Sequence, residues 1–456
     1  MAREEEITKE RLRKIEELKK NKIEPYPYFF DKKDNCSELQ EKYKKLKAGS
    51  KTKNKVKIAG RIKGIRDIGK LMFADLHDEK GKIQLQLQEG ETKSKEINFF
   101  KKFIDSGDFV GIEGKIIRTK RGELSVLVDK IELLAKSLLP LPEKWHGLQD
   151  KEERYRKRYL DLIMNPEVKE IFVKRARVIE ALRDFLLKRG FLEVETPTLQ
   201  PIYGGALAKP FRTHYNVYNS DVYLRIAPEL YLKRLVIGGF EKVFEFAKCF
   251  RNEGADWNHN PEFSMLEFYQ AYIDYNELMK ITEDLIIEVV KKINGKAEIK
   301  RKENIIKLKK PFKKITFEKL TNGKMTDEVF KEEVKKIKEP TFIINHPLDL
   351  SPLAKRNDKK TVQRFQLIID GIEAGNAFSE LNDPLEQEER FKEQQKRKEE
   401  EKHSFDKDFV EALKYGMPPT AGFGLGIDRL IMLLTDSGSL REVLLFPFMK
   451  NIEEEK

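Results

Sequence analysis

The sequence of 456 residues predicts an α+β protein in which a small β-barrel of the OB type precedes a larger domain of helices and strands. Three patterns predict this fold class. Between residues 55 and 135, five short runs alternate apolar and polar side chains, as the strands of a small barrel do. From 167 to 190 apolar side chains recur at helical spacing, and from 244 to 270 two alternating runs flank a polar loop, which indicates an antiparallel hairpin.

The composition is that of a charge-rich globular protein with a formal net charge of +12. This charge favours a polyanionic partner, although a surface rich in lysine and glutamate also serves solubility alone. The longest apolar runs are far shorter than the ~20 residues of a membrane span, and the amino terminus has no apolar signal core. Cys36 and Cys249 fit no metal-binding spacing. We therefore expect a cytoplasmic protein with no membrane contact.

The first 54 residues predict a basic helical extension. Within it, Ile7, Leu12, Ile15 and Leu18 fall on one broad helical face, and charged side chains fill the rest. Two interpretations stay open for this helix: a solvated helix, or an arm that grips nucleic acid.

Residues 55–137 are expected to form the barrel, because glycine-marked turns separate the alternating runs. Barrels of this type commonly bind single-stranded nucleic acid. Phe73 and Gln84 fall on adjacent predicted strands, where a ring can stack on a base and an amide can read a base edge. The alternative for Phe73 is packing in the barrel core.

A linker is expected over residues 138–165, because two prolines end the last barrel strand and a charged stretch follows. The second domain then spans 166–456. Its first helix ends at Gly190 and leads into a strand broken by Pro197. The lysine-rich stretch from about 291 to 340 shows little sustained pattern and predicts a surface insertion.

The predicted hairpin at 244–270 combines charge with aromatic rings. Counting by twos places Arg251 and Glu253 on one face of its first strand. The same count places four side chains on one face of the second strand: Phe263, Met265, Glu267 and Tyr269. Unpaired buried charge is costly, so a face that served only a core would not hold these groups. The pattern predicts a functional site, with a solvated hairpin face as the alternative.

Near the carboxyl terminus, glycines at 422, 424 and 426 fall on one face of a predicted strand, and a helix starts near Asp428. A face without side chains lets a flat ligand lie against the backbone. The glycine spacing differs from that of a Walker or dinucleotide-binding loop.

Five segments occur in this order along the chain: APELYLKRL, FRNEG, HNPEF, GNAFSELNDP and GMPPTAGFGLGIDR. Together with the helix and strand at 167–197, they resemble the three motifs of class II aminoacyl-tRNA synthetases. From PYPYFF to FPFMK, nearly the whole chain resembles the bacterial-type lysyl-tRNA synthetases of this class. The resemblance implies an OB-type anticodon domain, a catalytic domain with a mostly antiparallel mixed sheet flanked by helices, and a homodimer formed through the 167–197 segment.

The resemblance also implies a reaction: L-lysine is ligated to the 3′ end of tRNA(Lys) through a lysyl-adenylate, with ATP consumed and AMP and pyrophosphate released. The implied catalytic residues are Arg251 and Arg429. The implied ATP-binding residues are Arg251, Asn252, Glu253, His259, Asn260, Phe263, Glu373, Gly426 and Arg429. The implied lysine-binding residues are Gly205, Glu229, Arg251, Glu267, Tyr269, Asn376, Phe378 and Glu380. The implied anticodon-binding residues are Arg61, Phe73, Gln84 and Glu123.

Charge supports lysine as the substrate. Several carboxylates in one pocket require a cation, and lysine offers one ammonium for Glu229 and a second for Glu267 with Tyr269. Aspartate and asparagine enzymes share the architecture, but an aspartate pocket would need a cation opposite the substrate side chain.

One position departs from the family pattern. Related enzymes carry two carboxylates seven residues apart that hold Mg²⁺ against the ATP phosphates, and here Gln366 stands at the first position and Glu373 at the second. An amide oxygen binds Mg²⁺ without adding charge. A weakened metal site is therefore expected. Two alternatives remain: a lysine ligase that acts on a protein or lipid, and a catalytically silent paralogue that binds tRNA or assembles complexes.

Overall fold

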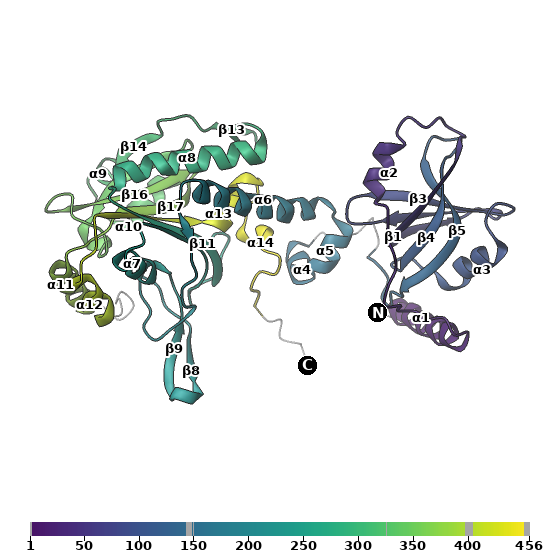
Figure 1. Cartoon of the computed structure of the whole chain (residues 1–456), viewed down its shortest axis with the longest axis horizontal. Helices are drawn as coiled ribbons and strands as arrows, with labels where there is room; N and C mark the ends of the chain where they lie inside the picture. The colour runs from purple at the N-terminus through teal and green to yellow at the C-terminus, as the bar shows by residue number, and fades with distance from the viewer. Residues whose placement is uncertain (1, 143–147, 149, 325, 397–404, 451–456) are drawn as a thin grey trace. The chain divides into compact units, whose positions relative to one another are not determined.

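The computed structural model describes residues 2–142, 148, 150–324, 326–396 and 405–450 (Figure 1). The chain divides into two compact units, Met1–Gly147 and Leu148–Lys456. Each unit has its own hydrophobic core, as expected for a chain of this length. Among the residues that the structure describes, no helix has the length and apolar character of a membrane span.

The first unit is the predicted barrel. Five strands close in the order β1-β2-β3-β5-β4. Their bounds are β1 (Lys51–Asp67), β2 (Leu71–His77), β3 (Lys82–Gln88), β4 (Phe109–Arg118) and β5 (Leu124–Ala135). The alternation seen in the sequence separates the two faces, since Met72, Ala74 and Leu76 are buried whereas Phe73 and Asp75 are partly exposed. The OB-type fold is thus confirmed.

Three helices complete the described part of this unit, and one of them was not predicted from the sequence. The helix α3 (Ser94–Phe103) lies between β3 and β4 and was not predicted, although Phe100 and Phe103 enter the barrel core. The extension folds as α1 (Ala2–Lys20) and α2 (Cys36–Lys42). From α1, Leu18 joins the barrel core and Arg11 donates to the carbonyls of Ser137 and Leu139, each at 2.9 Å. The helix is therefore fixed to the barrel.

The expected linker is shorter than predicted. Residues 143–147 and 149 lie outside the described residues, but α4 (Lys151–Arg156) and α5 (Arg158–Met164) belong to the second unit. Buried Arg158 lies 2.6 Å from Asp161 and donates to the carbonyl of Leu445 at 3.0 Å. Buried charges must be paired inside folded protein. Residues 151–164 are therefore part of the second unit rather than a flexible linker.

The second unit is built on an eight-stranded sheet in the order β14-β15-β16-β17-β18-β11-β10-β6. Only the two outer pairs, β14–β15 and β10–β6, are parallel, which confirms a mostly antiparallel mixed sheet. The strands are β6 (Leu192–Glu193), β10 (Lys242–Phe250), β11 (Glu262–Ala271), β14 (Lys313–Thr316), β15 (Thr341–Pro347), β16 (Thr361–Ile369), β17 (Ile372–Ser379) and β18 (Thr420–Gly426).

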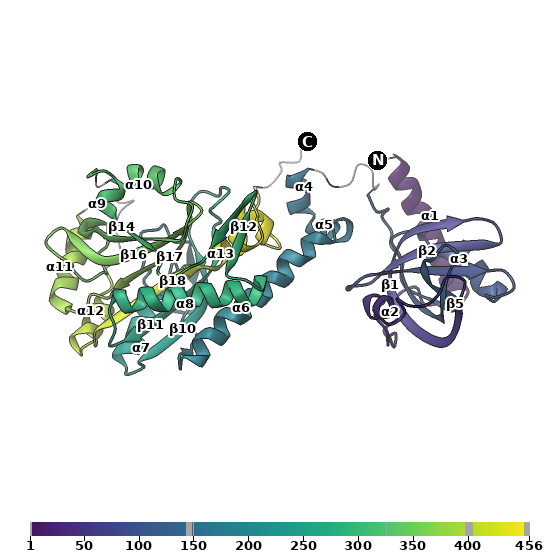
Figure 2. The ribbon, with the colours of Figure 1, turned by 90° about the horizontal axis from the view of Figure 1, so that it is seen from above.

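Helices cover both faces of this sheet. On one face, α6 (Glu167–Lys188) and α8 (Tyr275–Asn294) lie side by side and bury the large core together with α13 (Ile427–Leu434) (Figure 2). On the other face, α7 (Glu229–Ile237) packs with α11 (Pro384–Gln395) and α12 (Lys407–Lys414). Along β11, Leu266 and Phe268 join the first core, whereas Tyr269 joins the second cluster. The period-two alternation of β11 thus sets two environments on one strand.

Smaller elements complete the second unit. A three-stranded sheet of β7 (Leu199–Gln200), β9 (Ser220–Leu224) and β8 (Arg212–Tyr215) extends away from the large sheet (Figure 1). The others are the hairpin β12 (Glu298–Arg301) and β13 (Asn304–Lys307), and the helices α9 (Phe317–Leu320), α10 (Asp327–Val334) and α14 (Leu440–Val443).

The segment 291–340 differs from the predicted surface insertion. Its strand β14 joins the large sheet, and Ile299 and Phe312 are buried in the main core. Phe317 and Phe330 stack with ring centroids 4.7 Å apart in a second apolar cluster. The lysines that separate these apolar residues concealed the pattern, because each strand or helix here is only four to eight residues long. Of this segment, residue 325 lies outside the described chain.

Candidate active site

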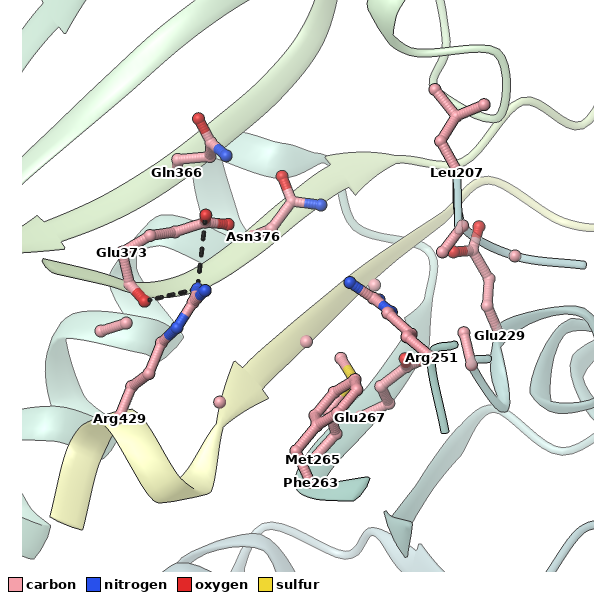
Figure 3. Close-up of a pocket in the computed structure, with 18 of the residues that line it drawn as sticks. Leu207, Glu229, Arg251, Phe263, Met265, Glu267, Gln366, Glu373, Asn376 and Arg429 are labelled. Atoms are coloured by element: carbon pink, nitrogen blue, oxygen red, sulfur yellow. Dashed lines mark hydrogen bonds and ion pairs between the residues drawn. The ribbon is translucent and has the colours of Figure 1, made fainter. Parts of the chain in front are cut away.

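A cavity of about 440 Å³ opens on the sheet face that carries α7 (Figure 3). Its walls come from β11, β16, β17 and β18, the loop at 205–207, the first residue of α7, and the loop between β10 and β11. Most residues that the sequence analysis singled out in this unit line the cavity. The two exceptions are Asn252 and Glu380, which do not belong to its lining.

The hairpin of β10 and β11 supplies one wall. Phe263, Met265, Glu267 and Tyr269 all line the cavity, as the count by twos predicted. The prediction for the first strand is wrong, because β10 ends at Phe250. Arg251 and Glu253 therefore lie in the loop rather than on a strand face, yet both line the cavity. The pairing of β10 with β11 ends at Phe250, so it does not fix the backbones of these two residues.

Arg251 is held in place by its neighbours. Its amide donates to the carbonyl of Pro261 at 2.8 Å, and its guanidinium carbon lies 5.0 Å from the ring centroid of Phe263. The buried Nε of Arg251 has no hydrogen-bond partner within the described part of the chain. A fixed guanidinium with an unused donor is suited to a carboxylate or phosphate ligand.

The glycines of β18 form a flat wall. A Cβ on Gly422 would lie 2.3 Å from Tyr269 Cε1, and a Cβ on Gly424 would lie 3.1 Å from Met265 Cε. Gly205 has φ +88°, and a Cβ added to it would lie 3.0 Å from Glu229 Cβ and 3.1 Å from Ala227 Cβ. Any larger residue at Gly422 would displace Tyr269 and Glu380, so the glycine is required there for these two side chains to pack against the strand.

One end of the cavity is acidic. Tyr269 donates its hydroxyl hydrogen to Glu267 Oε2 at 3.0 Å. Glu229, the first residue of α7, lies 2.6 Å from the ammonium of Lys233 one turn later. Lys233 also forms an ion pair with Glu380, which does not belong to the cavity lining. Lys233 was missed by sequence reasoning, and the only signal for it is its spacing of four from Glu229 on a helix.

Burial changes the protonation of these carboxyl groups. It raises the pKa of Glu267 to about 8, and the nearby charge of Glu229 adds to this rise while the hydrogen bond from Tyr269 opposes it. Burial also raises the pKa of Glu229, against the charge of Lys233. Without a cationic ligand, Glu267 is therefore mostly protonated at neutral pH.

The opposite end of the cavity is basic and polar. In Figure 3, Arg429 and Glu373 lie toward one side, Glu229 toward the other, and Arg251 between them. Arg429 donates to the carbonyl of Glu373 at 3.2 Å and lies 3.5 Å from its carboxylate. Asn376 accepts from Arg364 at 2.8 Å. The buried Gln366 Oε1 has no hydrogen-bond partner among the residues that the structure describes.

The loop between β10 and β11 is held by local hydrogen bonds. His259 Nδ1 lies 2.9 Å from Asp256 Oδ2, and Asn260 donates to the carbonyl of Glu262 at 2.5 Å. The amide of Asn252 donates to the carbonyl of Lys209 at 2.7 Å, and the amide of Lys209 donates to Glu253 Oε1 at 3.3 Å. These bonds connect the loop to the segment before β8.

One buried carboxylate connects the three sequence segments that carry the family motifs. Asp428, at the start of α13, accepts from the amide of Ser264 on β11 at 2.8 Å and pairs with Arg175 of α6 at 2.6 Å. Arg175 also donates to the Ser264 hydroxyl at 3.1 Å. Arg175, Ser264 and Asp428, which are far apart in sequence, thus meet at one point beside the cavity.

Comparisons with known proteins agree with this geometry. Residues 150–450 match the family described as tRNA synthetases class II (D, K and N), and residues 56–134 match the OB-fold nucleic acid binding domain. A lysine–tRNA ligase of Thermotoga maritima is 46% identical over 99% of this chain and 98% of its own length. Lysine–tRNA ligases of Carboxydothermus hydrogenoformans and Methanoculleus marisnigri are 46% and 45% identical, over 98% and 96% of this chain and 98% and 94% of their own lengths. The chain belongs to the class II lysine–tRNA ligase family.

The barrel of this lysine–tRNA ligase family member presents the four residues implied for anticodon binding. Phe73 is partly exposed on the outer face, so it is not a core residue, and the guanidinium of Arg66 lies 5.9 Å from its ring centroid. Gln84 lies opposite Asp75 and accepts from the Ser125 hydroxyl at 2.9 Å. Glu123 is exposed just before β5.

Arg61 is already engaged within the barrel. It donates to the carbonyl of Gly107 at 2.8 Å, and its guanidinium carbon lies 4.2 Å from the ring centroid of Phe109. Burial lowers the pKa of Arg61, and the negative charge of Asp108 opposes this effect. Arg66 rather than Arg61 is the arginine that adjoins Phe73.

We predict that an ammonium ligand binds this cavity more tightly as the pH rises from 6 to 8. The ligand requires an ionised Glu267, whose pKa in the free cavity is about 8. The dissociation constant of L-lysine should therefore fall about tenfold between pH 6 and 7, with release of about one proton on binding. Calorimetric titration in buffers of different ionisation enthalpy measures both quantities.

Glu267→Gln should remove this pH dependence and weaken lysine binding by roughly 1.5 to 3 kcal/mol, the range for a charged hydrogen bond. Glu262→Gln is the matched control, because Glu262 lies on the same strand but is exposed and pairs with Lys248. A wild-type affinity that does not change between pH 6 and 8 would contradict the assignment.

Proposed function

We propose that this chain ligates L-lysine to the 3′ end of tRNA(Lys) through a lysyl-adenylate, consuming ATP and releasing AMP and pyrophosphate. The observation that carries the proposal is the polarity of one cavity, with buried carboxylates at one end, Arg429 at the other and Arg251 between them. The full-length similarity to lysine–tRNA ligases supports the same substrates.

In the first step, a carboxylate oxygen of lysine attacks the α-phosphorus of ATP, and the bond from this phosphorus to the bridging oxygen breaks to release pyrophosphate. Arg251 and Arg429 are the proposed catalytic residues, because both neutralise charge on the reacting groups. Arg251 would hold the α-phosphate and the lysine carboxylate, and Arg429 would hold the γ-phosphate. The lysyl group then passes to the 3′-hydroxyl of the tRNA.

Adenine would lie on the ring of Phe263, with its amino group recognised by Glu253. Asn252 would flank the base, and His259 and Asn260 would approach the outer phosphates. The flat wall of β18 that ends at Gly426 supports the binding of a planar ligand against the backbone.

Lysine specificity follows from a count of buried charges. Glu229, Glu267 and Glu380 carry three negative charges when ionised, and Lys233 offsets one of them, so two remain for the two ammonium groups of lysine. We assign the α-ammonium to Glu229 and the ε-ammonium to Glu267 and Tyr269. Gly205, Asn376 and Phe378 would complete the pocket. An aspartate side chain would need a free cation here, whereas Lys233 is already paired with two carboxylates.

The residues present fit a Mg²⁺ site in which the protein supplies some of the ligands and ATP supplies the others. Within the described chain, no three His, Cys, Asp or Glu side chains gather to hold a metal ion. Glu373 and the unpartnered Gln366 Oε1 would supply two oxygen ligands, and the ATP phosphates would complete the shell, as Mg²⁺ sites with few protein ligands require. The bound ion would neutralise phosphate charge.

We also propose that the protein is cytoplasmic, since Cys36 and Cys249 are buried free thiols, as in a reducing compartment.

Pyrophosphate exchange with a panel of amino acids tests the proposed function. Exchange should depend on lysine, and transfer of labelled lysine to tRNA rather than to protein or lipid would establish the acceptor. Exchange with another amino acid would overturn the substrate assignment. No exchange at any magnesium concentration, together with retained tRNA binding, would favour the silent paralogue.

Phe73→Ala should weaken tRNA charging about tenfold while leaving lysine-dependent exchange unchanged, because the loss of one stacked base costs about 1 to 3 kcal/mol. Both assays are run on the same preparation. Ile68→Ala is the control, since Ile68 is an exposed apolar residue of the same barrel with no proposed contact. Equal losses in charging and exchange would mean that Phe73 only stabilises the fold.

Gln366→Glu should lower the magnesium concentration for half-maximal exchange by about tenfold, because it adds a charged ligand beside Glu373. Gln363→Glu adds the same charge to the same strand, at a position outside the cavity lining, and should have no effect. If Gln366→Glu changes nothing while Glu373→Gln abolishes exchange, position 366 does not contribute to the metal site.

We propose a homodimer formed through the 167–197 segment and its surroundings. Supporting this, Val173 and Leu187 on α6 and Leu199 on β7 are 42%, 49% and 53% exposed in the single chain. Sedimentation should give twice the chain mass of 53.6 kDa, and Leu199→Asp should shift the protein toward monomers. Tyr415→Asp, at an exposed site on α12's carboxyl end, should remain dimeric. A stable and active wild-type monomer would refute this proposal.

A further inference from the structure

Lys233 lies at the back of the acidic end of the cavity and is completely buried. Its ammonium is 2.6 Å from Glu229 Oε1 and forms a second ion pair with Glu380. The rings of Phe378 and Phe409 lie 5.2 and 5.9 Å from the same nitrogen. The position is that of a cation built into the protein, beside the place proposed for the ammonium groups of the substrate.

Three buried carboxylates could not all stay ionised without such a cation. Like charges in a low-dielectric site disfavour one another, and desolvation adds to this penalty. Burial lowers the pKa of Lys233, but Glu229 and Glu380 raise it more, so that its ammonium stays charged. Burial raises the pKa of Glu380 well above its usual range, against the opposing charge of Lys233.

Glu380 is the second carboxylate partner of this cation. It is 1% exposed and does not belong to the cavity lining, and its Oε1 lies 2.5 Å from the site of an added Cβ on Gly422, on the side where Tyr269 lies. The one charged partner near enough for an ion pair is Lys233, within the described residues. Lys233 therefore holds Glu380 and Glu229 together at the acidic end of the cavity.

We infer that Lys233 is a positioning residue for the substrate, because it fixes the Glu229 carboxylate at the cavity wall and engages Glu380. It thereby sets how much negative charge the cavity offers to the ammonium groups of the ligand. The inference rests on the proposed function, since it assigns Glu229 to a lysine ammonium. Lys233 itself does not touch the reacting atoms, so its effect should fall on lysine binding rather than on ATP binding.

Several other titratable or charged groups influence this cluster. On β11, Glu267 and Tyr269 face it; on β10, Glu245 acts on Glu267 from the neighbouring strand position. From β16, Arg364 contributes positive charge toward Glu229. Removal of Lys233 leaves these groups in place, so any change in pH dependence reports on Lys233, Glu229 and Glu380.

Lys233→Met tests the inference. The KM for lysine in pyrophosphate exchange should rise at least about tenfold at pH 7, with the KM for ATP changed by less than about twofold. The pH profile of lysine affinity should move to higher pH, because Glu229 and Glu380 then bind protons that the ligand must displace. Lys136→Met is the matched control: Lys136 is also a fully buried lysine that bridges two carboxylates, Asp105 and Asp108, but it lies in the barrel unit. It should lower the melting temperature without changing the KM for lysine.

The double variant Lys233→Met with Glu380→Gln tests whether Lys233 acts by offsetting carboxylate charge. It again has two carboxylates in excess over ammonium groups, as the wild type has, so its KM for lysine should be lower than that of Lys233→Met alone. Losses that multiply across the two substitutions would show that Lys233 and Glu380 act independently of each other, which overturns the inference. A folded Lys233→Met variant with wild-type lysine KM and pH profile also overturns it.

Calorimetric lysine binding to the wild type distinguishes the failure of this inference from that of the proposed function. If the wild type binds no lysine, the proposed function fails and the inference fails with it. If the wild type binds lysine and Lys233→Met binds it equally well over pH 6 to 8, only the role of Lys233 is wrong.

Discussion

The burial of three carboxyl groups at one end of a cavity is the constraint on which the second unit depends. Glu229, Glu267 and Glu380 are each 6% exposed or less, so water does not offset their charge. The protein offsets it with one internal ammonium, one tyrosine hydroxyl and protonation. What remains is a site whose charge is completed by a cationic ligand, which is the physical basis of the proposed lysine specificity.

Such a site needs a rigid frame, and the opposite face of the same sheet provides it. The ring centroid of Phe268 on β11 lies 5.4 Å from that of Phe191 and 5.5 Å from that of Phe423. Its neighbours Glu267 and Tyr269 face the cavity. Because strand residues alternate between faces, Glu267 is bracketed by Leu266 and Phe268, which belong to the apolar core. Asp428 then fixes β11 relative to α6 and α13 through Ser264 and Arg175.

The sequence predicted those features that depend on short-range periodicity. It did not predict features that depend on contacts between segments far apart in the chain. Alternation located the barrel and the cavity face of β11, and the spacing of glycines located the flat wall of β18. Periodicity could not reveal that β10 ends at Phe250, because the polar residues that follow continue the same count. It also missed α3 and the buried residues of 291–340, where lysines separate short apolar elements. The ion pair of Lys233 with Glu380 depends on a contact between distant segments, which no local pattern encodes.

The polarity of the cavity also constrains how a ligand with two ammonium groups and one carboxylate would lie. Both ammonium groups are drawn to the acidic end, where Glu229 and Glu267 lie, and the carboxylate is repelled from it. Arg251, whose buried Nε has no hydrogen-bond partner among the described residues, lies between Glu229 and Arg429 in Figure 3. A lysine oriented in this way would direct a carboxylate oxygen toward the end where Arg429 and Glu373 lie. The same charge separation that selects the amino acid would therefore also point its reacting group at the nucleotide, so that specificity and orientation have one electrostatic cause.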